Sequence, residues 1–228
     1  MNISAILPAY NEENNIEEAV RMLHGALLSA AAHFEIIVVD DGSTDSTGAV
    51  IRNMLSKYDS FKIIRHTHNK GYGCALRSGI AAAVHDWVFI IDADNQFDPN
   101  ELKNMTNKDA GRCDALIGYR VNRKDPLVRI ISSRVYNVFV RYLFGLNIKD
   151  INCAFKLLRR SVVSRLDIKA NHYVINTEIM LKLSRSKGII KECPVTHYPR
   201  KHGKSKILFK DIARTLAELC LLKREKLS

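Results

Sequence analysis

Short apolar runs alternate with helical patterns along the first half of this chain, and this alternation restricts the fold more than any other feature. Each run is rich in β-branched and aromatic residues, as in strands that are buried on both faces of a parallel sheet. The predicted strands are residues 3–7, 34–39, 61–64, 87–91 and 114–118. Strands that alternate with helices predict an α/β fold with a doubly wound, mostly parallel sheet.

Polar residues mark the expected starts of the intervening helices. Asn11 is predicted to cap the first helix, because asparagine is a good N-cap and acids follow it. Thr44 or Ser46 is expected to cap the second helix, and Asp98 precedes Pro99 as the cap of a later one. The first strand is expected to stop at Pro8, which has no N–H for a sheet ladder.

Asp92 and Asp94 directly follow the strand at 87–91, and Gln96 lies two residues further on. Acids just past the carboxyl end of a buried strand lie where open α/β sheets build ligand sites. Two carboxylates with an amide suit a hard divalent cation that keeps positions open for phosphate oxygens. The alternative is a solvated acidic turn, because aspartate and asparagine are ordinary turn residues.

The other predicted strands also end in polar loops, at residues 10–12, 40–41 and 69–70. All of these loops fall at one edge of a parallel sheet, which supports a single crevice there. Neither a Gly-x-Gly-x-x-Gly after the first strand nor a phosphate loop is present, so a Rossmann dinucleotide enzyme is disfavoured. His66 and His68 are expected to be ordinary loop histidines, because no third metal ligand has matching spacing.

The bulk composition indicates one globular domain that covers residues 1–228. The chain is 46% hydrophobic and 26% charged, and 228 residues can build a real core. No apolar run approaches the roughly 20 residues that span a bilayer, and the N-terminus lacks the pattern of a secretory signal. Five scattered cysteines without a Cys-x-x-Cys are expected to be reduced thiols of a cytoplasmic protein.

Charge divides the chain into two unlike halves. Residues 1–118 carry 10 Lys/Arg and 16 Asp/Glu, a net charge of −6, whereas residues 119–228 carry 25 Lys/Arg and 8 Asp/Glu, a net charge of +17. A basic half of this kind can face nucleic acid, an anionic membrane or anionic substrates. The halves are therefore expected to have different roles.

Two basic amphipathic helices are expected in the second half, at 129–146 and 206–226. The apolar face of the first comprises Ile131, Val135, Val138, Phe139, Tyr142 and Leu146. That of the second comprises Leu208, Ile212, Leu216, Leu219 and Cys220. Such helices are typical of membrane interfaces, and the alternative is that they pack on the sheet. Between them, the basic segment 193–206 is predicted to be a phosphate-gripping loop or an exposed basic turn.

At this point the motifs resemble glycosyltransferase family 2. The resemblance rests on residues 7–13 (Leu-Pro-Ala-Tyr-Asn-Glu-Glu), 38–45 (Val-Val-Asp-Asp-Gly-Ser-Thr-Asp), 69–76 (Asn-Lys-Gly-Tyr-Gly-Cys-Ala-Leu) and 92–96 (Asp-Ala-Asp-Asn-Gln). The segments 118–120, 150–157 and 199–206 resemble the dolichol-phosphate mannosyltransferase-like branch, which includes polyprenyl-phosphate glycosyltransferases. The resemblance implies a GT-A fold, a nucleotide-sugar donor and inversion of the anomeric centre.

The resemblance also implies a role for individual residues. Those implied to bind the donor are Pro8, Tyr10, Glu12, Asp41, Lys70 and Lys204. Those implied to hold Mg²⁺ or Mn²⁺ are Asp92, Asp94 and Gln96. Those implied on the acceptor side are Arg120, Arg129, Ser133, Arg134 and Asp150. The catalytic set is Asp92 and Asp94 with Arg120 and with Arg200, which closes on the donor diphosphate.

The reaction expected from these residues is transfer of a hexose from GDP-mannose or UDP-glucose to a polyprenyl or dolichyl phosphate. An ionised phosphate needs no general base, whereas transfer to a glycan hydroxyl, the alternative within the family, needs one, with Asp150 as the candidate. The lipid would be reached by peripheral contact with the membrane or through a membrane-spanning partner protein. A nucleic-acid-binding module is a further alternative, but no recognition motif supports it, and no nucleic-acid partner is expected.

Overall fold

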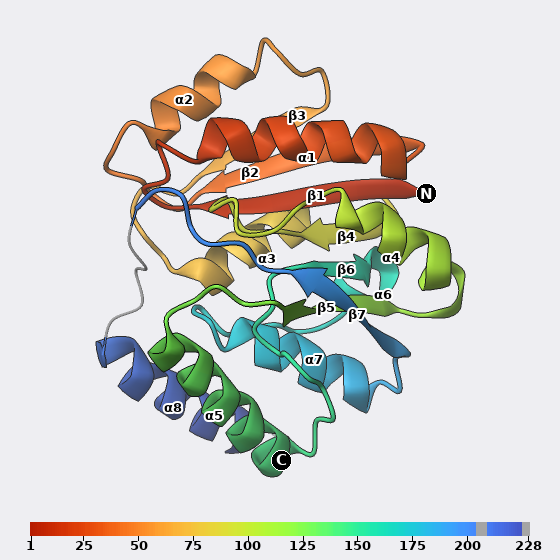
Figure 1. Ribbon diagram of the computed structural model, residues 1–228, viewed down its shortest axis with the longest axis vertical. Coiled ribbons are helices and arrows are strands. Elements are labelled where there is room, and N and C mark those ends of the chain that lie inside the picture. The colour runs from red at the N-terminus through yellow and green to blue at the C-terminus, as the bar shows by residue number, and fades with distance from the viewer. Residues whose placement is uncertain (204–208, 225–228) are drawn as a thin grey trace.

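The structure is a computed structural model that describes residues 1–203 and 209–224, without the side chains of residues 108–110 and 209–213. In this part of the chain, seven strands form one sheet in the order β3-β2-β1-β4-β6-β5-β7 (Figure 1). The strands are β1 (Asn2–Ala9), β2 (His33–Asp40), β3 (Phe61–Arg65), β4 (Trp87–Ile90), β5 (Ala115–Val121), β6 (Lys156–Arg159) and β7 (Ile190–Thr196). The predicted strand order along the chain is confirmed as far as β5, and the sheet is mostly parallel.

One strand runs against the others. β6 pairs antiparallel with β4 on one side and with β5 on the other, whereas the remaining pairs are parallel. The pairing sets Lys156 beside Ile117 of β5 and beside Ile90, the last residue of β4. Neither β6 nor β7 is among the strands predicted from the sequence pattern. The basic half of the chain therefore supplies a central strand, β6. This strand lies next to β4, which the acids Asp92 and Asp94 follow.

Helices cover both faces of the sheet. They are α1 (Ile16–Ala30), α2 (Thr47–Met54), α3 (Tyr72–Ala82), α4 (Glu101–Asp109), α5 (Leu127–Phe144), α6 (Arg160–Val163), α7 (Ile175–Arg185) and α8 (Phe209–Arg224), with a short 3₁₀ turn at Ala110–Arg112. Alternate residues of β1 enter opposite cores: Ile3 packs with α1, α2 and α4, whereas Ile6 packs with α3, α5 and α7. No described helix is both long enough and apolar enough to cross a bilayer.

Two predictions about the first loop are wrong. The first strand continues through Pro8 to Ala9, because β4 pairs with β1 only from Ile3 to Ile6 and the missing N–H interrupts no ladder there. Asn11 does not cap α1, which starts at Ile16 after Asn15. Asn11 instead takes a positive φ of 51° and accepts a hydrogen bond from the backbone N–H of Thr44 at 2.8 Å.

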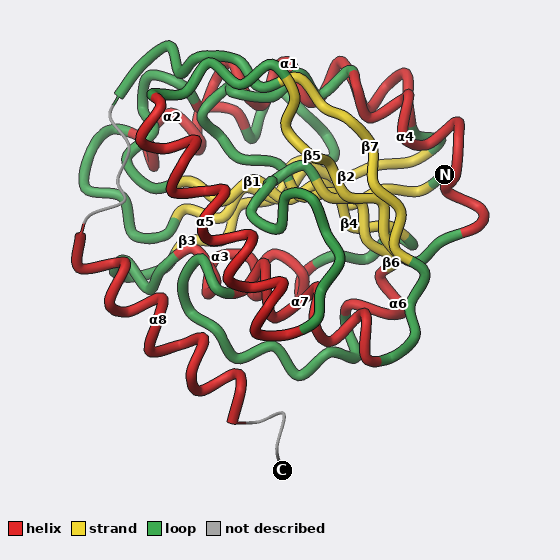
Figure 2. The backbone as a smooth tube through the Cα atoms, turned by 60° about the horizontal axis from the view of Figure 1, so that its bottom comes forward, coloured by secondary structure: helices red, strands yellow, loops and turns green. Residues whose placement is uncertain are grey.

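The amphipathic helices expected in the second half are present as α5 and α8, which lie side by side in both views (Figures 1 and 2). α5 buries Asn137, Val140 and Phe144 and leaves its predicted apolar face open to solvent. The exposed apolar residues of α5 are Leu127, Val128, Ile131, Val135, Val138, Phe139 and Tyr142, here named the α5 stripe. The expectation that Leu146 shares this face is wrong, because the helix ends at Gly145 and Leu146 is buried.

The predicted inner face of α8 is also only partly right. Leu219 is buried, and Leu222 joins it, but Leu216 and Cys220 are exposed. The side chains of Leu208 and Ile212 lie outside the described residues. α8 therefore contacts the rest of the molecule through a narrower strip than periodicity alone indicates.

Candidate active site

The first two strand-end loops are locked together at the carboxyl edge of the sheet. The backbone N–H of Asn11 donates to Ser43 Oγ at 3.0 Å, and that of Glu12 donates to Thr47 Oγ1 at 2.8 Å. These bonds place Pro8, Tyr10 and Glu12, the residues implied for the donor, on a loop whose backbone is fixed by its neighbour. The two loops thus form one fixed unit at the carboxyl edge, where open α/β sheets bind ligands.

Asp41 organises the third strand-end loop. Its buried carboxylate accepts hydrogen bonds from the backbone N–H groups of Lys70 and Gly71, at 3.0 and 2.8 Å. His66 Nδ1 lies 2.6 Å from the same carboxylate, and His66 Nε2 lies 2.9 Å from Ser78 Oγ. The side chain of Lys70 is exposed, so in this structure Lys70 contacts Asp41 through its backbone.

His66 is not the ordinary loop histidine that the sequence predicted. The ring is buried and spans Asp41 and Ser78, which links the end of β2 to α3. Sequence spacing carried no signal of this role, because the three residues come from separate elements.

Position 71 requires glycine. Its φ is 99°, and a Cβ there would lie 2.5 Å from the carbonyl oxygen of Asn171.

Asp92 and Asp94 form the acidic centre of the edge. Asp92 Oδ1 is buried without a hydrogen-bond partner, and burial together with the charge of Asp94 raises the pKa of Asp92 to about 7. Burial also raises the pKa of Asp94, although Arg200 opposes this. An orphaned carboxylate oxygen beside a second acid is costly unless a cation joins them, so the pair fits a divalent metal ion.

The rest of the metal-binding set is sparse. Gln96 donates its side-chain N–H to the carbonyl oxygen of Tyr198 at 3.0 Å, and its backbone N–H donates to Asp94 Oδ1 at 3.2 Å. Among the described residues, no cluster of three or more His, Cys, Asp or Glu side chains forms a complete metal site. Two carboxylates and an amide would leave several positions of Mg²⁺ or Mn²⁺ to waters and phosphate oxygens.

Two buried groups behind Asp92 were missed by sequence reasoning. Lys156 lies in β6 with its ammonium on Asn176 Oδ1, at 2.8 Å, and on the carbonyl oxygen of Cys153, and burial lowers the pKa of Lys156 to about 8. The ring of Tyr72 stacks on Tyr173, and burial followed by the charge of Asp92 raises the pKa of Tyr72 well above its usual value. A charged residue within the apolar run 154–158 was the available signal for Lys156.

Residues 197–203, here named the strap, cross from β7 to the first loop. Arg200 Nη2 lies 2.5 and 2.6 Å from the two oxygens of Glu12, and Arg200 Nη1 lies 3.6 Å from Asp94 Oδ2. Arg200 thus anchors the basic segment on the acidic edge, although residues 198–199 and 201–203 on either side of it are exposed. Lys204, which the sequence placed with the donor, lies outside the described residues.

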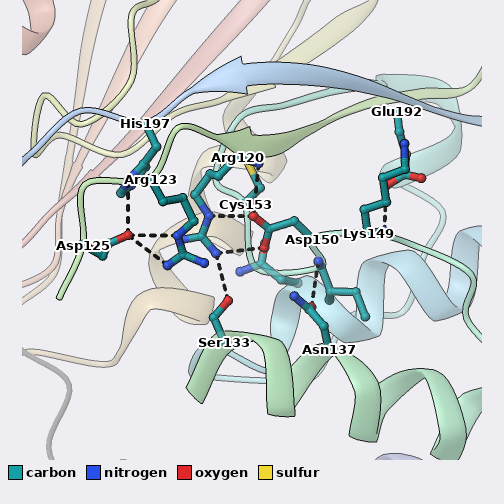
Figure 3. A network of polar contacts seen from close by, with 12 residues as sticks. Arg120, Arg123, Asp125, Ser133, Asn137, Lys149, Asp150, Cys153, Glu192 and His197 are labelled. Carbon is teal, nitrogen blue, oxygen red and sulfur yellow. Dashed lines mark hydrogen bonds and ion pairs between the residues drawn. The ribbon is translucent and has the colours of Figure 1, made fainter. Parts of the chain in front are cut away.

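On the other side of the edge, Arg120 and Asp150 form a buried fork. Arg120 Nε lies 2.6 Å from Asp150 Oδ2, and Arg120 Nη2 lies 2.8 Å from Oδ1 and 3.4 Å from Ser133 Oγ (Figure 3). Burial opposes ionisation of Asp150, but the hydrogen bonds and charge of Arg120 lower its pKa below the usual value. A carboxylate held in this way is poorly suited to the role of general base.

Asp125 gathers further basic groups in front of α5. Its Oδ2 lies 3.0 Å from Arg123 Nε and 3.3 Å from His197 Nδ1 (Figure 3). Its Oδ1 lies 3.5 Å from Arg129 Nη1. The guanidinium of Arg129 forms an ion pair with Asp125. This contact does not test the prediction that Arg129 binds the acceptor. Asp125, Arg123 and His197 were not identified from the sequence, because they meet only in the folded chain.

A cavity of about 310 Å³ opens between β5 and α5. It is lined by Tyr119, Arg120, Asn122, Arg123, Ile130, Arg134, Lys149 and Asp150. Three of the predicted acceptor residues, Arg120, Arg134 and Asp150, line it, and Lys149 places its ammonium 4.2 Å from the centroid of the Tyr119 ring. Four cations against one carboxylate make the cavity suited to an anion.

A known family profile covers more than half of the chain. Residues 4–167 match the profile described as Glycosyl transferase family 2. The chain belongs to this family. The chain is 30% identical over 223 residues to a dodecaprenyl-phosphate galacturonate synthase of Rhizobium johnstonii, and the match covers 96% of this chain and 65% of that protein. It is 30% identical over 220 residues to an undecaprenyl-phosphate 4-deoxy-4-formamido-L-arabinose transferase of Pectobacterium carotovorum, with coverage of 96% and 66%. The chain thus spans about two thirds of the length of these relatives.

Solved structures confirm the GT-A fold. Mannosyl-3-phosphoglycerate synthase from Rubrobacter xylanophilus superposes with a TM-score of 0.73 at 16% identity, covering 99% of this chain and 74% of that one. Glucosyl-3-phosphoglycerate synthase from Mycobacterium tuberculosis, solved with Mn²⁺, UDP and glucosyl-3-phosphoglycerate, gives 0.72 at 19% identity, covering 97% and 79%. The family profile over residues 4–167 confirms the family that the sequence motifs indicated, and the solved structures confirm its fold.

Proposed function

We propose that this chain is a metal-dependent, inverting glycosyltransferase that moves a hexose from a nucleotide sugar to a polyprenyl or dolichyl phosphate. Both relatives described above carry the name of a polyprenyl-phosphate sugar transferase. The expected donor is a nucleotide sugar that carries UDP or GDP, and UDP is named with one structural neighbour. Mg²⁺ and Mn²⁺ are both candidates for the metal.

One observation carries the proposal: the cationic cavity and the α5 stripe meet on the same helix. Ile130 and Arg134 line the cavity, whereas Ile131 and Val135, one residue further along in each case, are exposed on the stripe. A lipid phosphate has an anionic head and an apolar tail, and this arrangement offers adjacent surfaces for both. A soluble anionic sugar acceptor would use the cavity but leave seven exposed apolar residues without a purpose.

On the donor side, the residues hold charge rather than move protons. When bound, the metal ion would stabilise the negative charge that develops on the leaving diphosphate. Asp92, Asp94 and Gln96 are the residues that would hold it. Arg200, placed 3.6 Å from Asp94, offers a second positive group for the same diphosphate.

On the acceptor side, a phosphate oxygen would attack the anomeric carbon of the sugar. Its lone pair forms the new C1–O bond, the C1–O bond to the β-phosphate breaks, and that electron pair leaves with the nucleoside diphosphate. No proton moves, because the attacking oxygen is already ionised. Asp150 is paired with Arg120, and Glu178 accepts hydrogen bonds from the backbone N–H groups of Lys169 and Ala170, so neither carboxylate is poised as a base for a hydroxyl acceptor.

Peripheral contact with the cytoplasmic face of a membrane follows from the same proposal. Tyr142 is 90% exposed and Leu127 75% exposed, which are large values for apolar or aromatic side chains of an ordered helix. Exposed arginines such as Arg134 and Arg141 lie on the same helix, where anionic lipids would attract them. Contact through a membrane-spanning partner protein remains the alternative route to the lipid.

The proposal is tested by incubating the protein with Mn²⁺ or Mg²⁺, radiolabelled nucleotide sugars and a polyprenyl phosphate. Label should enter the organic phase, and EDTA should abolish the transfer.

Arg134→Gln should raise the KM for the lipid phosphate about tenfold without changing the KM for the nucleotide sugar, since it removes one charge from the cavity. Arg165→Gln, an exposed arginine outside the cavity, is the matched control. Label in a polysaccharide and none in lipid would overturn the proposal in favour of a hydroxyl acceptor.

A further inference from the structure

The strap is tied down at both of its ends. At its start, the Tyr198 carbonyl oxygen accepts from Gln96 Nε2 at 3.0 Å, and the Tyr198 N–H donates to the carbonyl oxygen of Gln96 at 2.9 Å. At its far end, the His202 carbonyl oxygen lies 3.3 Å from Asn15 Nδ2. Arg200 therefore lies in a segment that is fixed at one end to the loop with Gln96 and at the other end to Asn15, just before α1.

Glu12 lies at the centre of these contacts. It is 8% exposed, and both of its carboxylate oxygens face Arg200 Nη2, at 2.5 and 2.6 Å. Asn15 Nδ2 donates to Glu12 Oε2 at 2.7 Å, which fixes the carboxylate from the other side. The backbone N–H of Glu12 is used by Thr47. A carboxylate so closely engaged by an arginine is poorly placed to recognise a base or a ribose hydroxyl at the same time.

One nitrogen of the Arg200 guanidinium, Nη1, points toward Asp94. Nη2 is occupied by Glu12, and Nε donates to the carbonyl oxygen of His202 at 2.7 Å. Nη1, the third nitrogen, is the one that approaches Asp94, at 3.6 Å. Three fixed contacts thus aim one edge of the guanidinium at the acids where a donor diphosphate would lie.

We infer that Glu12 is a positioning residue that holds Arg200 in the orientation that receives the donor diphosphate. This inference rests on the proposed function and reassigns Glu12, which the family resemblance placed on the nucleoside. An arginine side chain loses considerable conformational freedom when it is fixed, and a residue that fixes it before the ligand arrives removes that cost from binding. Glu12 is therefore expected to strengthen the binding of an anion despite its own negative charge.

The variant Glu12→Gln separates the possible roles of Glu12, because each role predicts a different change in affinity for nucleoside diphosphates. Glu12→Gln keeps the size of the side chain and removes its charge. If Glu12 only repels the diphosphate, the variant binds nucleoside diphosphates more tightly; if Glu12 recognises the nucleoside, the variant loses affinity for nucleosides and nucleoside diphosphates alike. The positioning role predicts that UDP or GDP, whichever the wild-type protein binds, binds about tenfold more weakly while the corresponding nucleoside is unaffected.

The experiment measures UDP and GDP by isothermal titration with Mn²⁺ present, and uridine and guanosine by ligand-observed NMR. Glu18→Gln is the matched control, because Glu18 pairs with the neighbouring strap residue Lys201 at 3.0 Å and leaves Arg200 untouched. Nucleoside binding in each variant reports that the fold is intact. Arg200→Lys and the double variant complete a thermodynamic cycle, in which non-additive losses are expected.

The outcomes distinguish this inference from the function on which it rests. A wild-type protein that binds neither diphosphate overturns the proposed function and the inference with it. A wild-type protein that binds one of them, while Glu12→Gln binds it equally or more tightly, overturns the inference alone. Additive losses in the cycle would also overturn it, because Glu12 would then act independently of Arg200.

Discussion

Asp92 destabilises the metal-free protein, yet it is one of the proposed metal ligands. A single substitution can separate these two effects. Its Oδ1 is buried without a partner, and burial raises its pKa to about 7, well above the ordinary 3.8. The charged form is therefore disfavoured in the folded protein, so the penalty grows as pH rises from about 4 to 7 and is fully present above pH 7. Without metal, this residue destabilises the protein that it equips for catalysis.

Asp92→Asn should therefore stabilise the metal-free protein while abolishing transfer. At pH 8 with EDTA, the free energy of unfolding in urea should increase by about 2 kcal/mol, and this gain should vanish near pH 4. Transferase activity should fall by about 100-fold or more, because the metal loses a charged ligand. Asp98→Asn, an acid further along the same loop, is the control for both measurements. A destabilised Asp92→Asn at pH 8 would contradict this account.

His197 should give the folded protein a stability that depends on pH. Burial lowers its pKa to about 4, from an ordinary 6.5, although Asp125 opposes the shift. The unfolded chain thus binds a proton in the range between pH 6.5 and 4 that the folded protein does not, so stability is fully present above pH 6.5 and falls as pH decreases toward 4. Between pH 7.5 and 5.0, wild-type protein should lose about 2 kcal/mol more than His197→Gln in urea titrations. Equal losses in both proteins would show that another group is responsible.

At the scale of the element, α5 carries apolar side chains on its exposed face as well as on its buried face. Val140 and Phe144 lie in the core, whereas Ile131 and Val135 are 58% and 63% exposed. Replacing both of the latter by serine should change the free energy of unfolding by less than about 0.5 kcal/mol. It should reduce binding to phosphatidylglycerol vesicles about tenfold or more, because apolar area is lost from the contact.

The matched control for the α5 stripe lies on the opposite face of the same helix. Phe144→Ala should cost about 3 kcal/mol of stability, while the fraction that remains folded binds vesicles as the wild-type protein does. Sedimentation with vesicles and urea denaturation measure the two quantities separately. Unchanged vesicle binding by the double serine variant would contradict an interfacial role for the stripe.

The elements also show where sequence patterns stop being informative. Periodicity predicts α5 and its apolar face, but it cannot tell whether a neighbour covers that face. It predicts the strands that precede Asp41 and Asp92, because both acids follow apolar runs. It cannot predict that Asp41 is held by His66, or that Asp150 is held by Arg120, because those partners are joined only by tertiary structure. The antiparallel β6 is missed for the same reason, since strand direction is not a local property.

At the scale of the whole molecule, the charge difference between the halves should govern association with membranes. Residues 119–228 have a net charge of +17, which anionic lipids attract at a distance set by ionic strength. Binding to vesicles that contain 30% anionic lipid, a roughly physiological share, should weaken at least about tenfold between 50 mM and 500 mM NaCl. Neutral vesicles should show weaker binding with little salt dependence. Salt-insensitive binding to anionic vesicles would mean that apolar contacts alone hold the protein there.

The antiparallel insertion of β6 also has a consequence for how the chain is made. Within the part of the chain that the structure describes, the sheet neighbours of β5 are β6 and β7, so Ala115–Val121 has none of them until Lys156–Arg159 has been synthesised. During vectorial synthesis, the nascent acidic half therefore exposes one open edge of β4 and both edges of β5 while α5 and its apolar stripe are being added. We expect this interval to be the point at which the growing polypeptide most needs a chaperone.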